Sequence, residues 1–298
     1  MKNNILKYFF ILLSLLIILI AYLSTAGIET DKFNDQIKKK INQINTNLDV
    51  DLKKIKITLD PIKLKIYAKT VGTTIFFSKK PLALESIKTQ VSLSSLIKSK
   101  ISSSNIEVKT RSILFNDLIK FIRITKDKPE LIILEKIAKK GHIILDLSLN
   151  IDENGKIKND YVIEGLLKDA SINFFNRANF KDINFNFNFQ KDNYSFNEIN
   201  FKAEKVKFTS KKLNVKKKKN SFLVDAIVEN DQSSLNSNIL KLLNLSFENI
   251  IIDDAKFKTN NKFSLEIDEK FKVKNIILSS DINITQLKCK KFNIIDNY

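Results

Sequence analysis

The sequence predicts a mainly β protein: an N-terminal transmembrane helix and an amphipathic helix, followed by an elongated, curled antiparallel sheet with an open groove and a few short helices. Three observations support this fold class. Apolar and polar residues alternate through many segments, as in DINFNFNF at 182–189, and this period of two is typical of strands. Turn signals recur about every 8 to 13 residues. The first thirty residues contain a long apolar run without charge.

The apolar run extends from Tyr8 to Ile28, and its 21 residues form a helix of roughly 32 Å, enough to cross a bilayer core of about 30 Å. Lys2 and Lys7 precede the run, so the positive-inside rule keeps the short N-terminal end in the cytoplasm. We expect residues 1–28 to be a cytoplasmic tip with a membrane anchor. A cleaved signal peptide with a small-x-small site at 24–26 is the alternative, and both interpretations export the rest of the chain.

Residues 29–140 form the second predicted region, with helices at both ends and strands between. An amphipathic helix is expected where apolar residues recur in steps of four, four, three and four, either capping a domain core or lying on a membrane surface. These residues are Phe33, Ile37, Ile41, Ile44 and Leu48. Strands are predicted at 55–59 and 62–66 around a turn at Asp60-Pro61, and at 87–93 and 105–110. Helices are predicted at 116–124 and at 129–140, the second ending on Gly141.

Residues 141–298 are predicted to form a β-meander, the groove domain, interrupted by one helix at 235–245. Each strand is expected from period-two alternation between turn residues. The predicted strands are 145–151, 161–166, 170–175, 183–189, 194–201, 205–208, 213–215, 222–228, 250–256, 263–267, 273–278 and 282–287. The four lysines at 216–219 are expected in a solvated turn that discourages edge pairing.

The composition argues against most enzyme mechanisms. His142 and Cys289 are the only histidine and cysteine, so the chain cannot assemble a nucleophile with a histidine base, or a histidine and cysteine metal site. We therefore predict no enzyme activity, no cofactor and no metal. A hydrolase with paired carboxylates remains an alternative, because the chain has 33 acidic residues, although no pair stands out in a loop.

The net charge of +18 would fit a polyanionic partner, but arginine occurs only at 111, 123 and 177. Phosphate and base recognition favour the planar fork of arginine. No recognition helix or basic strand with stacking aromatics is present either, so we expect no nucleic-acid partner.

The apolar side of the predicted sheet has two interpretations. If the sheet folds onto itself, the alternating Ile, Leu and Phe residues form a sandwich core. If it curls without closing, the same residues line a trough that requires an apolar occupant, because soluble proteins rarely expose so large an apolar strip. Periodicity alone does not separate the two interpretations.

Two segments, VSLSSLIKSKI at 91–101 and DENGKIKNDYVIEGLLKDASINFF at 152–175, follow a single membrane helix and an amphipathic helix. In this arrangement the chain resembles the N-terminal part of the AsmA-like superfamily, which includes AsmA, TamB and YhdP-type proteins. The resemblance implies an inner-membrane anchor, a body in the periplasm built as a β-groove, and a part in phospholipid transport or outer-membrane biogenesis. It implies no catalytic residues. The lipid-facing residues would include Leu145, Leu147, Leu149, Phe185, Phe187 and Phe189.

The predicted sheet is too short for a protein that bridges the periplasm by itself. About fifteen strands at roughly 4.8 Å spacing give a ribbon of about 70 Å, whereas a groove that bridges the periplasm needs roughly 200 Å. We therefore expect a short member, a module that needs envelope protein partners, or the front of a longer protein. The alternative function is a membrane-anchored β-rich scaffold or assembly factor with a closed protein core and no lipid cargo.

Overall fold

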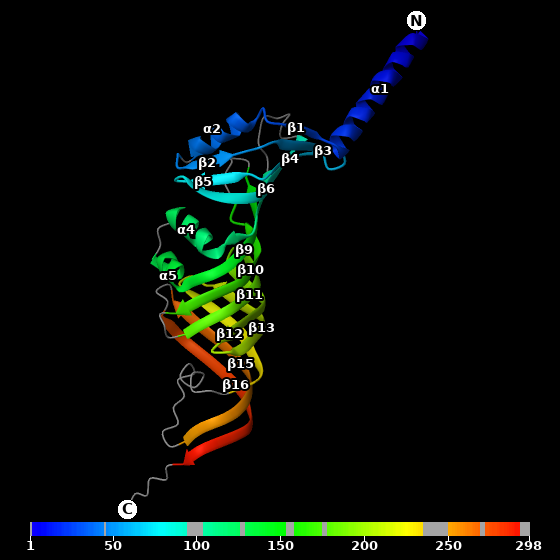
Figure 1. The fold of residues 1–298 in the computed structure, drawn as a ribbon. Helices are drawn as coiled ribbons and strands as arrows, with labels where there is room; N and C mark the ends of the chain where they lie inside the picture. Colours follow the sequence, from blue (N-terminus) through cyan, green and yellow to red (C-terminus); the bar gives the residue numbers. More distant parts are fainter. Residues whose placement is uncertain are drawn as a thin grey trace, which may run out of the picture. The chain divides into compact units, whose positions relative to one another are not determined.

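The protein is mainly β, and the residues that the structure describes form 16 strands in one open antiparallel sheet (Figure 1). The computed structural model describes residues 2–44, 46–93, 104–125, 129–152, 158–174, 178–234, 250–268 and 272–292. The strand order is linear from β1 to β16, with β2, β5 and β8 pairing beside the main path. Helices are few, and one of them is the apolar N-terminal helix. The predicted fold class is confirmed at this level.

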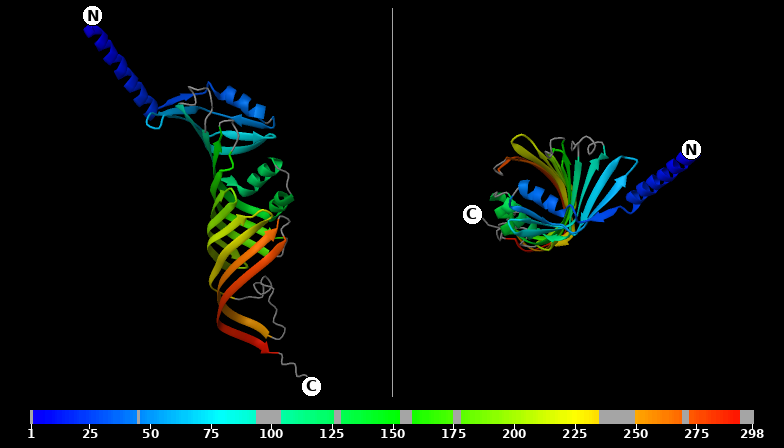
Figure 2. Two further views of the ribbon diagram at one scale, coloured as in Figure 1. Left: turned by 180° about the vertical axis from the view of Figure 1, so that it is seen from behind. Right: turned by 90° about the horizontal axis from the view of Figure 1, so that it is seen from above.

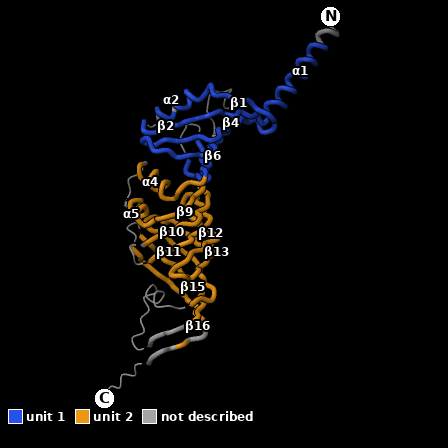
Figure 3. The backbone as a smooth tube through the Cα atoms, in the orientation of Figure 1, with its two compact units in different colours: residues 1–111, 145–162 blue, residues 112–144, 163–298 orange. Residues whose placement is uncertain are grey.

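Two compact units divide the chain (Figure 3). Unit 1 contains residues 1–111 and 145–162, and unit 2 contains residues 112–144 and 163–298. Strand β9 contributes its first half to unit 2 and its second half to unit 1.

Unit 1 begins with α1, whose segment Lys7–Thr25 is long and apolar enough to cross a membrane. Its main sheet path is β1, β3, β4, β6, β7 and the second half of β9, while β2 pairs with β5 and β5 with β6. The elements are α1 (Lys2–Thr25), β1 (Ile28–Thr30), α2 (Asn34–Ile44), β2 (Leu48–Asp51), β3 (Ile55–Asp60), β4 (Lys65–Val71), β5 (Thr74–Phe77), β6 (Lys80–Ser92), β7 (Ser104–Thr110) and β9 (Ala138–Ile151).

Gly27 turns the chain from α1 into β1. Its φ is +69°, and a Cβ at this position would lie 2.5 Å from the carbonyl oxygen of Ile57. Only glycine combines this left-handed conformation with so close an approach to a neighbouring backbone. The end of α1 is therefore fixed against β3.

Residues 62–64 differ from the prediction, which placed them at the start of a strand. In the structure β3 ends at Asp60, β4 begins at Lys65, and Ile62 and Leu64 lie in the turn between them. The Asp60 carboxylate accepts hydrogen bonds from the backbone N–H groups of Ile62 and Lys63, at 3.1 and 2.9 Å. This side-chain turn competes with strand pairing, so the alternation of Ile62, Leu64 and Ile66 does not produce a strand here.

Unit 2 places two short helices beside a run of long strands. Each strand from β9 to β16 neighbours the next in chain order, as in the predicted meander. The elements are β8 (Ile113–Leu114), α4 (Phe115–Thr125), α5 (Pro129–Ile137), the first half of β9, β10 (Val162–Phe174), β11 (Ala178–Gln190), β12 (Asn193–Ala203), β13 (Val206–Lys217), β14 (Ser221–Ser234), β15 (Ile250–Asp268) and β16 (Val273–Phe292).

The helix predicted at 129–140 is three residues too long, because β9 begins at Ala138. Gly141 does not cap the helix but lies inside β9 with a φ of +131°, where a Cβ would stand 2.7 Å from the Cβ of Ala170. Leu114 pairs with His142 in the same strand. Strand pairing and this close packing outweigh the local helix-stop signal.

Several strands are longer than predicted, because polar segments expected as turns stay within the sheet. The predicted strands at 205–208 and 213–215 form one strand, β13, and the four predicted strands after residue 250 form β15 and β16. Asn230 shows why a polar residue can remain in a strand: it is 1% exposed, and its Oδ1 accepts hydrogen bonds from the N–H and the hydroxyl of Thr259 at 3.0 and 2.6 Å. The helix predicted at 235–245 falls outside the described residues.

Irregular positions interrupt the long strands of unit 2 and bend them (Figure 2). Register shifts occur in the β11–β12, β13–β14, β14–β15 and β15–β16 pairs. Asp182 and Glu198 lie at such shifts with φ values of 51° and 54°. Extra residues of this kind increase the local twist and bend of a sheet.

Candidate functional site on strands β11 to β16

Two rows of apolar side chains cross six strands of unit 2 on one face of the sheet. They follow directly from the strand register, because residues paired across an antiparallel ladder point to the same side. We call them the apolar rows. The first contains Phe187, Phe196, Leu213, Ala226, Phe263 and Leu278, and the second contains Phe189, Tyr194, Val215, Val224, Leu265 and Ile276.

Aromatic side chains contact one another at the β11–β12 end of the apolar rows. The ring centroids of Phe187 and Phe189 are 5.0 Å apart, and Phe196 lies 5.4 Å from both Phe185 and Phe189. Tyr194 is also 5.4 Å from Phe189, in an edge-to-face arrangement. These separations are in the range that favours aromatic pairs.

Phe187 is the most enclosed of the predicted lipid-facing residues, at 5% exposed. Its ring lies over Gly165 of β10, where a Cβ would approach its Cζ to 2.4 Å and the carbonyl oxygen of Ile144 to 2.2 Å. Gly165 therefore creates the space that the ring fills. Phe185 and Phe189 are only half-buried.

The apolar rows become more exposed toward β16. Leu278 and Ile276 are 62% and 64% exposed, and Ile282 and Ile284 on the same side of the strand are 57% and 50% exposed. In the described part of the chain, β16 pairs with β15 alone. The protein thus presents a strand edge and an apolar surface together, a combination that marks an interaction surface in a folded protein.

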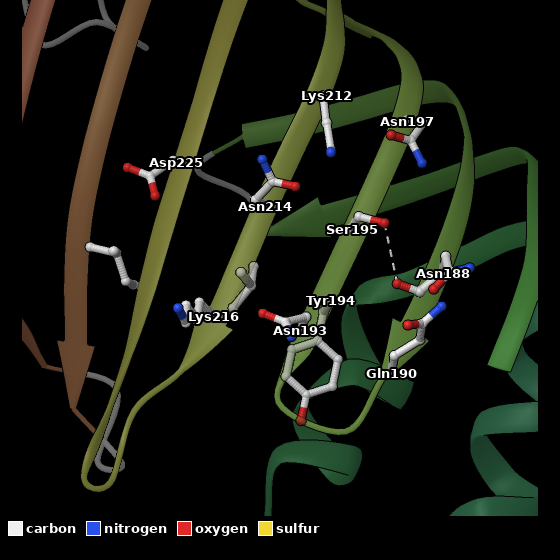
Figure 4. A pocket seen from close by; sticks show the side chains of 12 residues that line it. Asn188, Gln190, Asn193, Tyr194, Ser195, Asn197, Lys212, Asn214, Lys216 and Asp225 are labelled. Carbon is white, nitrogen blue, oxygen red and sulfur yellow. Dashed lines mark hydrogen bonds between the residues drawn. The ribbon is translucent and has the colours of Figure 1, made fainter. Parts of the chain in front are cut away.

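The opposite face of the same strands carries mostly polar side chains. Asn188, Ser195, Asn214 and Asp225 are paired in register and line a shallow hollow of about 570 Å³ together with Lys212 and Lys216 (Figure 4). The Ser195 hydroxyl donates a hydrogen bond to the carbonyl oxygen of Asn188 at 3.3 Å. Such a surface suits water and polar groups rather than acyl chains.

Amide side chains connect neighbouring strands on this polar face. Asn184 donates to Asn200 at 3.2 Å, and Asn186 donates to Glu198 at 2.8 Å. The amide-rich side of the DINFNFNF segment is therefore occupied by cross-strand hydrogen bonds, which fix the register with the Phe side facing the other way.

Two carboxylates of unit 2 have lowered pKa values, and neither belongs to the apolar rows. A hydrogen bond from Ser221, with the nearby Lys218 ammonium, lowers the pKa of Glu266. The hydrogen bond and charge of Lys202, whose Nζ lies 2.8 Å from the Asp182 carboxylate, lower the pKa of Asp182. Both arrangements are cross-strand pairs at the surface rather than acid and base groups facing a cleft.

Leu145, Leu147 and Leu149 belong to the second half of β9, in unit 1, and are half-buried. Leu147 pairs with Val108 and Leu149 with Ile106. On the other side of the strand, Asp146 and Lys109 form an ion pair of 2.8 Å, which raises the pKa of Lys109. The structure therefore places the predicted leucines and the predicted phenylalanines in different units.

Only Phe187 and Phe189 of the apolar rows belonged to the predicted site. The other ten members were absent from it, namely Tyr194, Phe196, Leu213, Val215, Val224, Ala226, Phe263, Leu265, Ile276 and Leu278. Local alternation marked most of these residues as strand residues. Their alignment with Phe187 and Phe189 depends on the register of five strand pairs and on the bulges between them, which alternation within one strand does not specify.

Neither the single histidine nor the single cysteine belongs to the apolar rows. His142 is exposed on β9, and Cys289 occupies a strand position opposite Ile252. Across the described ranges, no three His, Cys, Asp or Glu side chains are grouped to hold a metal ion.

Comparisons with known proteins supply no relative from which a function could be inferred. No family model, no curated protein sequence and no solved structure matches the chain.

Proposed function

We propose that the protein is a membrane-anchored, AsmA-like protein of the periplasm that carries the acyl chains of phospholipids along the apolar rows. In this proposal α1 is a retained single-pass anchor in the inner membrane, and the body contributes to phospholipid transport or outer-membrane biogenesis. The apolar helix Lys7–Thr25 supports the anchor.

One observation carries the proposal: the apolar rows stay in register over six strands and become more exposed toward β16, where Leu278 is 62% exposed. A sheet face that served only as a core would be covered by protein along its length. An acyl chain is long, flexible and purely apolar, so it fits a row of Phe, Leu, Val and Ile side chains without any specific polar partner.

The test uses two neighbouring residues on β16 as a matched pair. Leu278 pairs with Phe263 and belongs to an apolar row, whereas Ile277 pairs with Ser264 on the polar face. Both are apolar and exposed, at 62% and 72%. A photoreactive amino acid at position 278 of the full chain, expressed in cells grown with radioactive phosphate, is expected to capture labelled phospholipid. The same group at position 277 is expected to capture little.

Equal labelling at positions 277 and 278 would show nonspecific contact with lipid, and an absence of label at 278 would remove the case for lipid carriage. Both results contradict the proposal. Photoreactive groups at Val224 and Leu265, in the second apolar row, test whether capture extends along the sheet.

A scaffold or assembly factor with a closed protein core is the second candidate function, and the burial of Phe187 favours it. At 5% exposed, with its ring against Gly165, Phe187 acts as a core residue. Capture of protein rather than phospholipid at position 278 would support this candidate, because the apolar surface of β16 would then be a protein interface.

A further inference from the structure

The turn between β3 and β4, residues 61–64, combines a fixed backbone with exposed apolar side chains. Asp60 accepts hydrogen bonds from the backbone N–H groups of Ile62 and Lys63. The carbonyl oxygen of Leu64 accepts a hydrogen bond from the N–H of Leu93 at 2.8 Å. The turn is thus held from both of its ends, and the direction of its side chains is set by the fold.

Ile62 is 92% exposed, more than any other large apolar side chain that the structure describes, and Leu64 is 60% exposed. Leu64 also has a φ of +50°, a left-handed conformation that is unfavourable for a residue other than glycine, asparagine or aspartate. The exposed Lys63 lies between them. Turns in water usually carry Gly, Asn, Asp or Ser instead. This chain therefore holds two large apolar side chains in solvent, one of them in a strained conformation.

The turn follows the end of β3, and that end of β3 lies close to the end of α1. Ile28 of β1 pairs with Ile57 of β3 in antiparallel register, so β3 continues from Ile57 past the start of β1, alongside the segment that links β1 to α1. A Cβ on Gly27 would lie 2.7 Å from the Cγ2 of Thr58, which confirms that the end of α1 and the end of β3 are adjacent. The three residues from Ile57 to Asp60 span about 10 Å. Figures 1 and 2 show the end of β3 at the base of α1.

We propose that the β3–β4 turn is a second membrane contact, in which Ile62 and Leu64 insert into the interface of the same bilayer that α1 enters. Lys63 lies between them at headgroup level, where a lysine ammonium can meet lipid phosphate. The occupant of this apolar tip is the lipid surface itself, because the tip lies beside the segment that leads out of the apolar helix. Apolar side chains combined with a cation are also what binds interfacial helices to a membrane surface.

The consequence is an orientation for the neighbouring sheet. A single helix lets the attached body rotate and tilt freely, whereas a helix end and a turn held at one membrane surface fix the direction of β3 and β4. The inference rests on the proposed anchoring by α1, but it does not depend on lipid carriage by unit 2.

The experiment measures the depth of three single positions in the full chain reconstituted into nanodiscs of phosphatidylethanolamine and phosphatidylglycerol. Cys289, the single cysteine, is first replaced with serine. Leu16→Cys, Ile62→Cys and Lys80→Cys are then labelled separately with an environment-sensitive fluorophore. Lys80 is the matched control, because it is exposed in unit 1 at the far end of β6 from Ser92, which pairs with Lys65 beside the turn. The 12 residue steps from Ser92 to Lys80 correspond to at most about 40 Å along the strand.

We expect lipids that carry a nitroxide near the headgroup end of the acyl chain to quench the label at position 62 roughly twofold or more, with blue-shifted emission. The label at position 80 should be unaffected, and the label at position 16 should be quenched by nitroxides deeper in the chain. Quenching at 16 with none at 62 would overturn the inference and leave the anchor standing. Absence of quenching at 16 would overturn the anchor and this inference with it, and equal quenching at 62 and 80 would also contradict the inference.

Discussion

At the scale of single residues, Gly165 decides how much of the DINFNFNF ribbon becomes core. A glycine in the middle of a long strand usually weakens it. Here its missing side chain admits the ring of Phe187, which is 5% exposed, while Phe185 and Phe189 remain half-buried. One position on β10 therefore distinguishes a packed phenylalanine from its two neighbours of the same type.

Gly165→Ala tests this packing. The added Cβ would lie 2.2 Å from the carbonyl oxygen of Ile144 and 2.4 Å from the Phe187 ring, so we expect a loss of about 2 to 3 kcal/mol in the free energy of unfolding. Phe187→Ala should cost about 3 to 4 kcal/mol through the cavity it leaves, and Phe189→Ala clearly less. Denaturant unfolding followed by circular dichroism measures all three. Equal losses for the two Phe variants would contradict the assigned role of Gly165.

We expect Glu266 to make the stability of unit 2 depend on pH. Its pKa is lower in the folded protein than its ordinary value of 4.5, chiefly because Ser221 donates a hydrogen bond to it. A lowered folded pKa contributes stability above the unfolded value, and this contribution is lost as the pH falls through the folded pKa. Glu266→Gln should therefore lower the melting temperature slightly at neutral pH, and the difference from the unaltered protein should shrink as the pH falls below the ordinary pKa of 4.5.

The hydrogen-bond donor provides the control for this pH experiment. Ser221→Ala removes the cause of the lowered pKa and keeps the carboxylate, so its melting temperature should show the same flatter dependence on pH. A flat profile for Glu266→Gln beside an unchanged profile for Ser221→Ala would show that the hydrogen bond to Ser221 is not the cause.

At the scale of elements, β16 differs from the strands before it because its apolar side chains are not covered by other parts of the described protein. On the side of the apolar rows, β16 carries four side chains that are 50% to 64% exposed, Ile276, Leu278, Ile282 and Ile284. The members of the apolar rows on β11 to β15 are buried or half-buried. An edge strand has a neighbour on one side only, so its side chains lack half of the cross-strand contacts of a central strand.

Replacing Ile276 and Leu278 together with Asn should therefore leave the free energy of unfolding within about 1 kcal/mol of the unaltered value, because exposed side chains contribute little. The same double variant should lose phospholipid that copurifies with the full chain, as measured by mass spectrometry. Ile277→Asn, on the polar face of the same strand, should retain it. Retention of lipid by the double variant would contradict the role given to the apolar rows.

At the scale of the whole molecule, the sequence by itself determined the apolar helix, the mainly β class and the order of a meander, because these depend on local periodicity and chain order. It also identified DINFNFNF as a ribbon with one apolar side. Local sequence patterns predicted the ends of elements less well, because contacts with other segments decide them. The helix expected to reach Lys140 ends at Ile137, and the strand expected from Ile62 starts at Lys65.

Only the tertiary structure decided which apolar residues stand together. The register of β11 to β16, with its bulges, aligns Phe187 with Leu278 across five strand pairs. If the register of one pair shifted by a single residue, the apolar row would be interrupted there, because the next strand would place polar side chains in it. It also decided that Ile62 is exposed in the turn between β3 and β4, while the ring of Phe187 is buried against Gly165. These outcomes depend on contacts between residues far apart in the chain, and alternation within one segment carries no information about them.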